Sequence, residues 1–206
     1  MKKLLLVGAI ALFSAVSAQK NSLLIGGNIG YNTSKTTVGS NPSINATSDQ
    51  FSFNPLIGYQ FADHLTAGVK FGVSTSKDTF NYTNNLSGTQ KTNSFTYGVF
   101  GRYTIPLSDL FAVYGDLYVF GMNGKITTPS FNGTGITYSD TKTNGYGISL
   151  VPNIFINLKN SFKLNFNIGG LNYTHNEIKG VDNKTNQFGF QFGKGAVVGI
   201  SKNFKL

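Results

Sequence analysis

Residues 51–73 read FSFNPLIGYQFADHLTAGVKFGV, and two alternating runs in this stretch decide the fold. Large or apolar side chains occupy every second position on both sides of a break at 62–64: Phe51, Phe53, Pro55, Ile57, Tyr59 and Phe61 before it, and Leu65, Ala67, Val69, Phe71 and Val73 after it. Period-two alternation over about ten residues is the pattern of a β-strand with two unlike faces. The stretch therefore predicts a hairpin with one bulky apolar face and one small, mostly polar face.

Six further runs show the same alternation and bring the expected number of strands to eight: 22–34, 94–105, 110–121, 144–157, 162–173 and 188–204. The expected connections alternate between short turns at 62–64, 106–109 and 158–161 and long polar stretches at 35–50, 76–93, 122–143 and 174–187. The long stretches are rich in Asn, Thr, Ser and Gly, which favour turns and loops. Short turns at one end and long loops at the other are typical of bacterial outer-membrane barrels.

The bulky face must point outward if the strands form a barrel of this size. An eight-stranded barrel has room inside for little more than its own side chains or one small ligand. Small and polar residues, such as Gly145, Gly147 and Ser149, suit that interior, whereas the Phe and Tyr face suits lipid. A soluble lipocalin-like barrel or a sandwich of the same length would bury the bulky face instead. Since lipid offers backbone groups no partner, the first strand should pair with the eighth.

We therefore predict an all-β chain that folds as an eight-stranded antiparallel up-and-down transmembrane β-barrel. An even number of strands places both termini on the short-turn side, which is periplasmic in this class of barrel. Residues 1–18 are expected to be a cleaved signal peptide, because Lys2 and Lys3 precede an apolar run and small residues end at Ala18. The run is shorter than the ~20 residues of a spanning helix. Cleavage before Gln19 would leave one domain, residues 19–206.

Composition narrows the classes of partner and cofactor. The chain has no Cys, which excludes disulfides and thiolate metal sites, and His64 and His175 do not have zinc-like spacing. No cofactor or metal is therefore expected. A formal net charge of +9 could indicate a nucleic-acid-binding protein, but a protein exported to the outer membrane does not encounter nucleic acid. We expect the basic residues to be solvated or to contact anionic outer-membrane lipids and lipopolysaccharide phosphates.

Four charged residues fall on inward positions and form the candidate site, a lumen charge cluster of Lys70, Arg102, Asp116 and Lys163. A buried charge needs a partner, so Asp116 is expected to pair with Arg102 or Lys70. The cluster would be either a structural salt bridge in a plugged lumen or a polar lining for a small solute. Aromatic residues with the same parity are expected to fill the interior: Phe100, Tyr114, Tyr118, Phe120 and Phe155.

A catalytic alternative rests on His175 and Glu177, which share a strand face at the start of the last long connection. Some outer-membrane barrels modify lipid A with a Ser/His/acid set near the outer leaflet. Nucleophilic catalysis needs a nucleophile beside its base, and no nucleophile motif accompanies this pair. We therefore expect no catalytic residues and no enzymatic activity.

Three residues disturb the strand pattern. Pro55 and Pro152 remove a ladder donor in mid-strand, and a local bulge is expected at each. Lys194 has outward parity, where a cation at mid-membrane depth is unfavourable. Either a bulge at 193–195 changes its parity, or Lys194 lies at the upper interface.

Two stretches resemble a known family. Pro55, Gly58, Tyr59, Asp63 and Gly68 form a Pro-x-x-Gly-Tyr-x-x-x-Asp-x-x-x-x-Gly run, and the chain closes on GISKNF at 199–204. Both are similar to segments of the outer membrane β-barrel domain family, the small porin-like barrels of the general size of OmpA and OmpX. The closing stretch resembles the aromatic end that the barrel-assembly machinery recognises, although Lys205 and Leu206 follow Phe204 here.

The resemblance implies fold and location but no activity, because one fold hosts many functions. Our leading expectation is a non-enzymatic outer-membrane protein with a structural role, or with a surface-interaction role through the long loops. A narrow pore or small-ligand transport barrel is the first alternative, and an outer-leaflet lipid A-modifying enzyme is the second. The sequence does not identify a loop partner.

Overall fold

The computed structural model describes residues 21–37, 45–81, 87–132 and 135–206. The expected signal peptide, residues 1–18, and its cleavage site lie outside these residues. The strands are β1 (Ser22–Thr37), β2 (Asn45–Gln60), β3 (Leu65–Asn81), β4 (Ser87–Pro106), β5 (Phe111–Phe131), β6 (Ile136–Asn157), β7 (Phe162–Ile178) and β8 (Asn183–Lys205). A short 3-10 turn, η2 (Lys159–Ser161), precedes β7. Among the described residues, no helix is long and apolar enough to cross a membrane.

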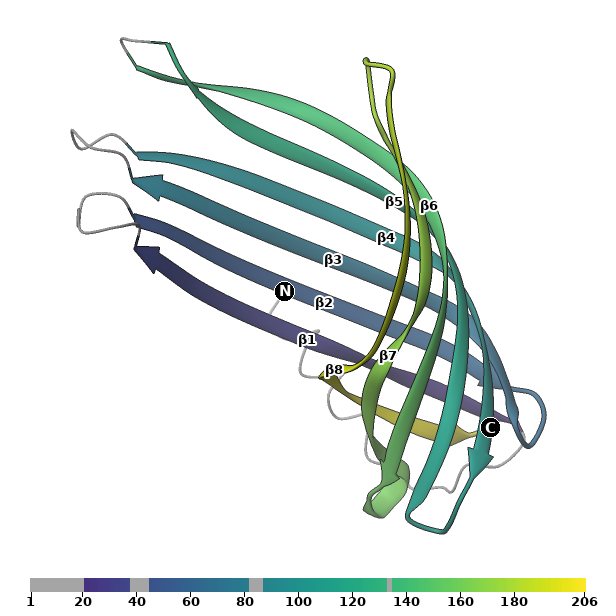
Figure 1. The fold of residues 1–206 in the computed structure, drawn as a ribbon. Helices are drawn as coiled ribbons and strands as arrows, with labels where there is room; N and C mark the ends of the chain where they lie inside the picture. The colour runs from purple at the N-terminus through teal and green to yellow at the C-terminus, as the bar shows by residue number, and fades with distance from the viewer. Residues whose placement is uncertain (1–20, 38–44, 82–86, 133–134) are drawn as a thin grey trace.

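The strands are antiparallel and close into a ring in chain order (Figure 1), which confirms the predicted barrel. Closure depends on a short seam between the first and last strands. β1 pairs with β2 along its whole length, from Ser22–Gln60 to Thr37–Asn45. With β8 it pairs only from Ser22–Lys205 to Gly27–Ile200. Above that seam β1 and the rest of β8 run apart, as the purple and yellow strands in Figure 1 show.

The two faces of each strand are divided as the alternation predicts. Outward residues of the opening hairpin, such as Phe53, Ile57 and Phe71, remain exposed to the surroundings of the barrel. Inward residues are buried in two clusters: Leu24, Phe100 and Tyr118 in one, and Ala112, Tyr114 and Phe155 in the other. Phe120 packs against the first cluster. Side chains of the barrel itself therefore occupy much of the narrow interior, and the bulky outward face forms an apolar band that suits lipid.

The expected long connections are wrong in extent, because most of their residues belong to paired strands. β3 and β4 remain in register through Lys77–Lys91 to Asn81–Ser87, and β5 and β6 through Thr127–Asp140 to Phe131–Ile136. In the β3–β4 segment the outward residues become polar, and in the β5–β6 segment they are mixed, with Thr127 and Asp140 below Phe131 and Tyr138, so the regular apolar alternation that marked the strands stops. Thr is nevertheless a good strand residue, and cross-strand pairing satisfies the backbone outside lipid as well as inside it. The hairpins therefore continue beyond the apolar band.

Two register shifts, one between β6 and β7 and one between β7 and β8, interrupt the regular ladder. Next to Pro152, the register between β6 and β7 shifts between Leu150 and Asn153, which confirms the expected irregularity there. The register between β7 and β8 shifts again between Asn167 and Gly169, whose partners are Val197 and Phe192, so the residues 193–196 bulge. Gly193 has φ +69°, in the left-handed region that favours glycine. A bulge bends its strand, and this one accompanies the departure of β8 from β1.

The expected bulge at Pro55 is wrong. Pro55 pairs with Gly27 of β1, and on its other side the pairs Phe53–Val73 and Leu56–Lys70 keep one common register. The ladder between β2 and β3 is interrupted at Asn54 and Pro55 without an inserted residue. A missing proline N–H is thus accommodated as a gap in the ladder rather than as a bulge.

Candidate functional site

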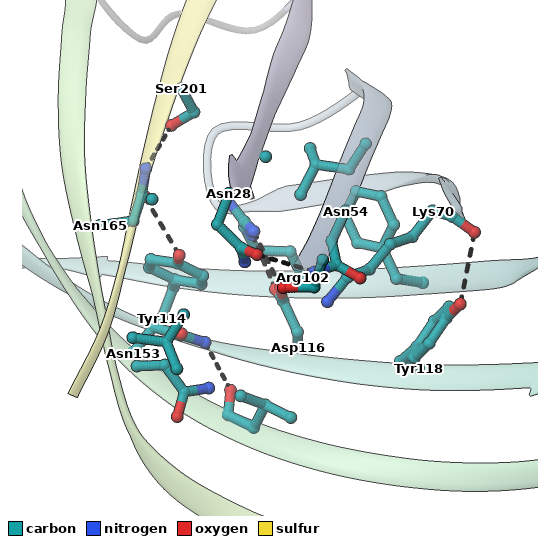
Figure 2. Close-up of a pocket in the computed structure, with 18 residues that line it drawn as sticks. Asn28, Asn54, Lys70, Arg102, Tyr114, Asp116, Tyr118, Asn153, Asn165 and Ser201 are labelled. Atoms are coloured by element: carbon teal, nitrogen blue, oxygen red, sulfur yellow. Dashed lines mark hydrogen bonds and ion pairs between the residues drawn. The ribbon is translucent and has the colours of Figure 1, made fainter. Parts of the chain in front are cut away.

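The lumen holds a polar cavity of about 390 Å³ at the level where β1 and β8 separate (Figure 2). Such a volume falls within the ~300–1,000 Å³ typical of small-molecule sites. Its lining is mostly polar and comes from every strand: Gly27, Asn28, Ser52, Asn54, Leu56, Lys70, Phe100, Arg102, Tyr114, Asp116, Tyr118, Val151, Asn153, Asn165, Asn167, Val197, Gly199 and Ser201.

Arg102 and Asp116 form a two-pronged ion pair across β4 and β5. Arg102 Nε donates to Asp116 Oδ1 at 2.7 Å, and Arg102 Nη2 donates to Asp116 Oδ2 at 2.8 Å. Only 6% of the Arg102 side chain and 13% of the Asp116 side chain are exposed. The guanidinium also lies 3.8 Å from the centroid of the Tyr114 ring and 5.6 Å from that of Phe100. The pair is therefore held rigidly inside an aromatic frame.

Lys70 lines the same cavity but does not share that carboxylate directly. Its Nζ lies 5.2 Å from the centroid of the Tyr118 ring, and the Tyr118 hydroxyl donates to the Lys70 carbonyl at 3.3 Å. With Asp116 committed to Arg102, the three charges that line the cavity leave one positive charge uncompensated. An excess positive charge in a partly enclosed cavity favours the binding of an anion.

Lys163 belongs to a separate network nearer the short turns. Its Nζ donates to Asn203 Oδ1 at 3.1 Å and lies 4.5 Å from the Phe155 ring centroid. Asn203 Nδ2 in turn donates to Ser22 Oγ at 2.9 Å and to Gln60 Oε1 at 3.0 Å. All these polar side chains are buried. This network ties β1, β2, β7 and β8 together at the short-turn end and fills the lumen there.

The structure thus gathers Lys70, Arg102 and Asp116 around one cavity and sets Lys163 apart from them. The prediction missed the neutral polar residues of the site. Asn54 Nδ2 donates to Asn28 Oδ1 at 2.8 Å, and across the seam on β7 Asn165 links Tyr114 to Ser201 through bonds of 3.1 and 2.9 Å. Their inward parity was a usable signal. It was hidden because Asn is frequent throughout this chain.

His175 lies within β7 and not at the start of a loop, so its expected position was wrong. It shares an outward face with Glu177, and its Nε2 lies 3.2 Å from Glu177 Oε1. The other ring nitrogen, Nδ1, lies 2.7 Å from Asn186 Oδ1, and the ring stacks on Tyr146. Both ring nitrogens therefore contact other side chains, Nδ1 the Asn186 amide and Nε2 the Glu177 carboxylate. A histidine that activates a nucleophile needs one nitrogen for that nucleophile.

Among the comparisons with known proteins, the match to a family model is the one that identifies the family of this chain. No curated protein matches the sequence. Among solved structures, the chain is similar to Ail, the attachment invasion locus protein of Yersinia pestis, with 12% identity and a TM-score of 0.34. That alignment covers 90% of this chain and 99% of Ail. Residues 4–193 match the outer membrane protein beta-barrel domain family. Because that match spans most of the sequence, the chain belongs to the outer membrane protein beta-barrel domain family and is an outer-membrane barrel protein.

Proposed function

We propose that the protein is a non-enzymatic barrel with a plugged lumen, whose hairpins form an interaction surface outside the membrane. The observation that carries this proposal is the length of the strands. A tilted strand needs about 9–11 residues to cross a membrane, whereas β5 has 21 and β6 has 22. Their pairing from Met122–Gly145 to Phe131–Ile136 extends beyond the apolar band. At ~3.3 Å per residue, those ten or so pairs add about 30 Å of paired strand.

The projecting part of the β5–β6 hairpin has the character of a contact surface. Phe131 and Tyr138 are more than half exposed near its end, where their cross-strand partners are Ile136 and Pro129. Below them Lys125 Nζ lies 2.8 Å from Asp140 Oδ2, and Thr127 donates to Asp140 Oδ1 at 2.7 Å. These bonds, from Lys125 first, lower the pKa of the Asp140 carboxyl. Exposed aromatic side chains on a rigid, hydrogen-bonded support are common contact residues in interfaces.

Absence of conduction is the first consequence of the plugged lumen. The Arg102–Asp116 pair, its aromatic frame and the Lys163–Asn203 network occupy the interior towards the short turns. We expect the folded protein, inserted in a planar phospholipid bilayer, to give no steady single-channel steps. Insertion would be checked by the heat-modifiable gel shift of protein recovered from the same membranes. Steady steps of one size from inserted protein would establish the alternative, a narrow pore.

Contact with lipopolysaccharide phosphates is the second part of the proposal. Two lysine pairs stand directly opposite one another just beyond the apolar band, Lys77 with Lys91 and Lys125 with Lys142. All four side chains are exposed on the outward face. An acid lies beside one lysine of each pair, since Asp49 stands opposite Lys77 and Asp140 binds Lys125, so each group keeps one excess positive charge. A bound phosphate would complement that charge, and each lysine near an anionic membrane surface contributes about 1 kcal/mol.

The doubly substituted variant Lys77→Gln/Lys91→Gln should bind lipopolysaccharide less tightly than the native barrel. Loss of about 2 kcal/mol corresponds to about 30-fold weaker binding at low salt, and the difference should shrink as salt is added. Binding would be measured by titrating lipopolysaccharide onto barrels in nanodiscs of uncharged lipid. Lys205→Gln, an exposed lysine at the short-turn end, is the control and should bind like the native protein. Equal affinity of the double variant would contradict this part of the proposal.

We also propose that both chain ends are periplasmic and that the barrel-assembly machinery handles the last strand. β1 begins and β8 ends beside the short turns, where Ser22 pairs with Lys205. Short turns are the periplasmic side of such barrels. Phe204 lies in β8, opposite Leu23, within the seam that closes the ring. A periplasmic factor that engages this end would therefore act where closure is completed.

A further inference from the structure

The polar lumen cavity meets an apolar groove on the outside of the barrel at the seam. The groove has a volume of about 490 Å³ and is lined by outward side chains of β1, β2, β7 and β8, including Ile25, Ile29, Leu164 and Val198. Four residues line both spaces and define what we call the portal: Gly27, Asn28, Gly199 and Ser201. The wall of the barrel therefore has a polar chamber on its inner side and an apolar groove on its outer side, and both spaces reach these four residues.

The portal exists because the seam ends there. Gly27–Ile200 is the last pair between β1 and β8, so Asn28 and Gly199 face one another without belonging to the ladder. Two of the four portal residues lack a side chain. The other two are held back by hydrogen bonds, Asn28 to Asn54 of β2 and Ser201 to Asn165 of β7. The bulge at 193–196 bends β8 away just beyond this point.

The chemistry of the two sides matches that of an amphiphile. The groove offers mainly aliphatic and aromatic contacts at the depth of the apolar band, where hydrocarbon is the surrounding solvent. Its one charged lining residue, Lys202, is buried with its Nζ 4.6 Å from the Phe162 ring centroid and 5.1 Å from that of Phe204. The chamber offers the Lys70 ammonium together with the amides of Asn28 and Asn54, which Figure 2 shows close to Arg102 and Asp116. With the Arg102–Asp116 pair neutral overall, the chamber lining carries a single excess positive charge. That charge is matched by a monoanionic head group.

We propose that the portal binds a long-chain fatty acid, with its carboxylate in the chamber near Lys70 and its acyl chain in the outer groove. At Gly199 itself the two strands are in close contact, since a Cβ atom there would lie 2.9 Å from the Gly27 carbonyl oxygen. The acyl chain would therefore leave the chamber just above Asn28 and Gly199, where β1 and β8 are no longer paired, and a carboxylate supplies the one negative charge that the chamber lacks. Binding of this kind needs neither conduction nor catalysis, so it goes beyond the function proposed above.

The portal can be closed and reopened by a designed disulfide. A Cβ atom at Gly199 would lie 3.6 Å from the Cβ atom of Asn28, within the ~3.5–4.5 Å that a disulfide requires. The native chain has no Cys, so Asn28→Cys/Gly199→Cys introduces the only two thiols. If the oxidised double variant does not form the cross-link, the proposed proximity of β1 and β8 at this point is wrong.

Binding would be measured with carboxyl-labelled palmitate added to folded barrels in phospholipid nanodiscs. We expect saturable binding to the native protein, weaker binding to the reduced double variant because the new Cβ atom at 199 crowds the Gly27 carbonyl, and loss of binding when the double variant is oxidised. Gly199→Cys alone, which cannot cross-link, controls for the substitution under both conditions. Palmitate binding to the oxidised double variant equal to that of the reduced form would overturn the portal.

Lys70→Gln tests the head-group end independently of the cross-link. Loss of a charge-assisted bond to a carboxylate should weaken palmitate binding about tenfold or more. Lys179→Gln, an exposed lysine in the turn between β7 and β8, should leave it unchanged. Equal affinity in Lys70→Gln would remove the assigned head-group site. Native mass spectrometry that finds a two-chain phospholipid in place of the fatty acid would overturn the single-chain assignment.

Discussion

Asp116→Asn is expected to lower the free energy of unfolding by about 3–5 kcal/mol, because breaking a buried ion pair leaves an uncompensated charge. The charge left behind is the Arg102 guanidinium, of which only 6% of the side chain is exposed. Tyr114 and Phe100 still contact it, but a neutral amide at 116 no longer balances it. The measurement is equilibrium unfolding in urea with phospholipid vesicles. Circular dichroism and gel mobility report the folded fraction, since the chain has no Trp.

Two further variants make the result specific to the buried pair. Asp140→Asn breaks the Lys125–Asp140 pair, whose side chains are about half exposed, and should change stability by less than about 1 kcal/mol. The double replacement Arg102→Met/Asp116→Leu removes both charges and should recover much of the loss. A stability of Asp116→Asn within about 1 kcal/mol of the native value would mean that the lumen around Arg102 is well hydrated.

Leu117→Arg is expected to destabilise the barrel in a bilayer by about 2–4 kcal/mol, the range for a cation on the lipid face near mid-depth. Leu117 lies on the outward face of β5, near the middle of the apolar band of that strand, and is half exposed. Asn123→Arg places the same side chain on the same face and strand, beyond the apolar band. Its expected effect is about 0–1 kcal/mol.

The comparison of these two variants tests the membrane assignment of the outward face directly. Both would be unfolded with urea in the same vesicles, and their difference is the quantity of interest. A large penalty for Leu117→Arg and a small one for Asn123→Arg locate the hydrocarbon along β5. Equal small effects at both positions would mean that water, and not lipid, surrounds this face.

The convergence of Lys70, Arg102 and Asp116 was predictable from the sequence because they occupy inward positions on consecutive strands. Antiparallel neighbours with known parity bring such residues together, and register pairs Arg102 directly with Asp116. The sequence did not predict that Lys163 lies apart from this group, because the position of Lys163 along the barrel axis depends on how far β7 is shifted relative to its neighbouring strands. The polar halves of the hairpins were also missed, because their strands lack an apolar face to mark them.

Alternation of bulky and small residues by itself determined that the chain forms antiparallel strands and which face of each meets lipid, because successive side chains of a strand point to opposite sides. Only the tertiary structure decided where the ring closes. The seam joins Ser22–Gly27 to Ile200–Lys205, segments at opposite ends of the chain. Its short length, the bulge at 193–196 and the meeting of chamber and groove at Gly27 and Gly199 arise from strand pairings between those distant segments. Local sequence pattern does not encode such pairings, since each depends on the register of every strand in the ring.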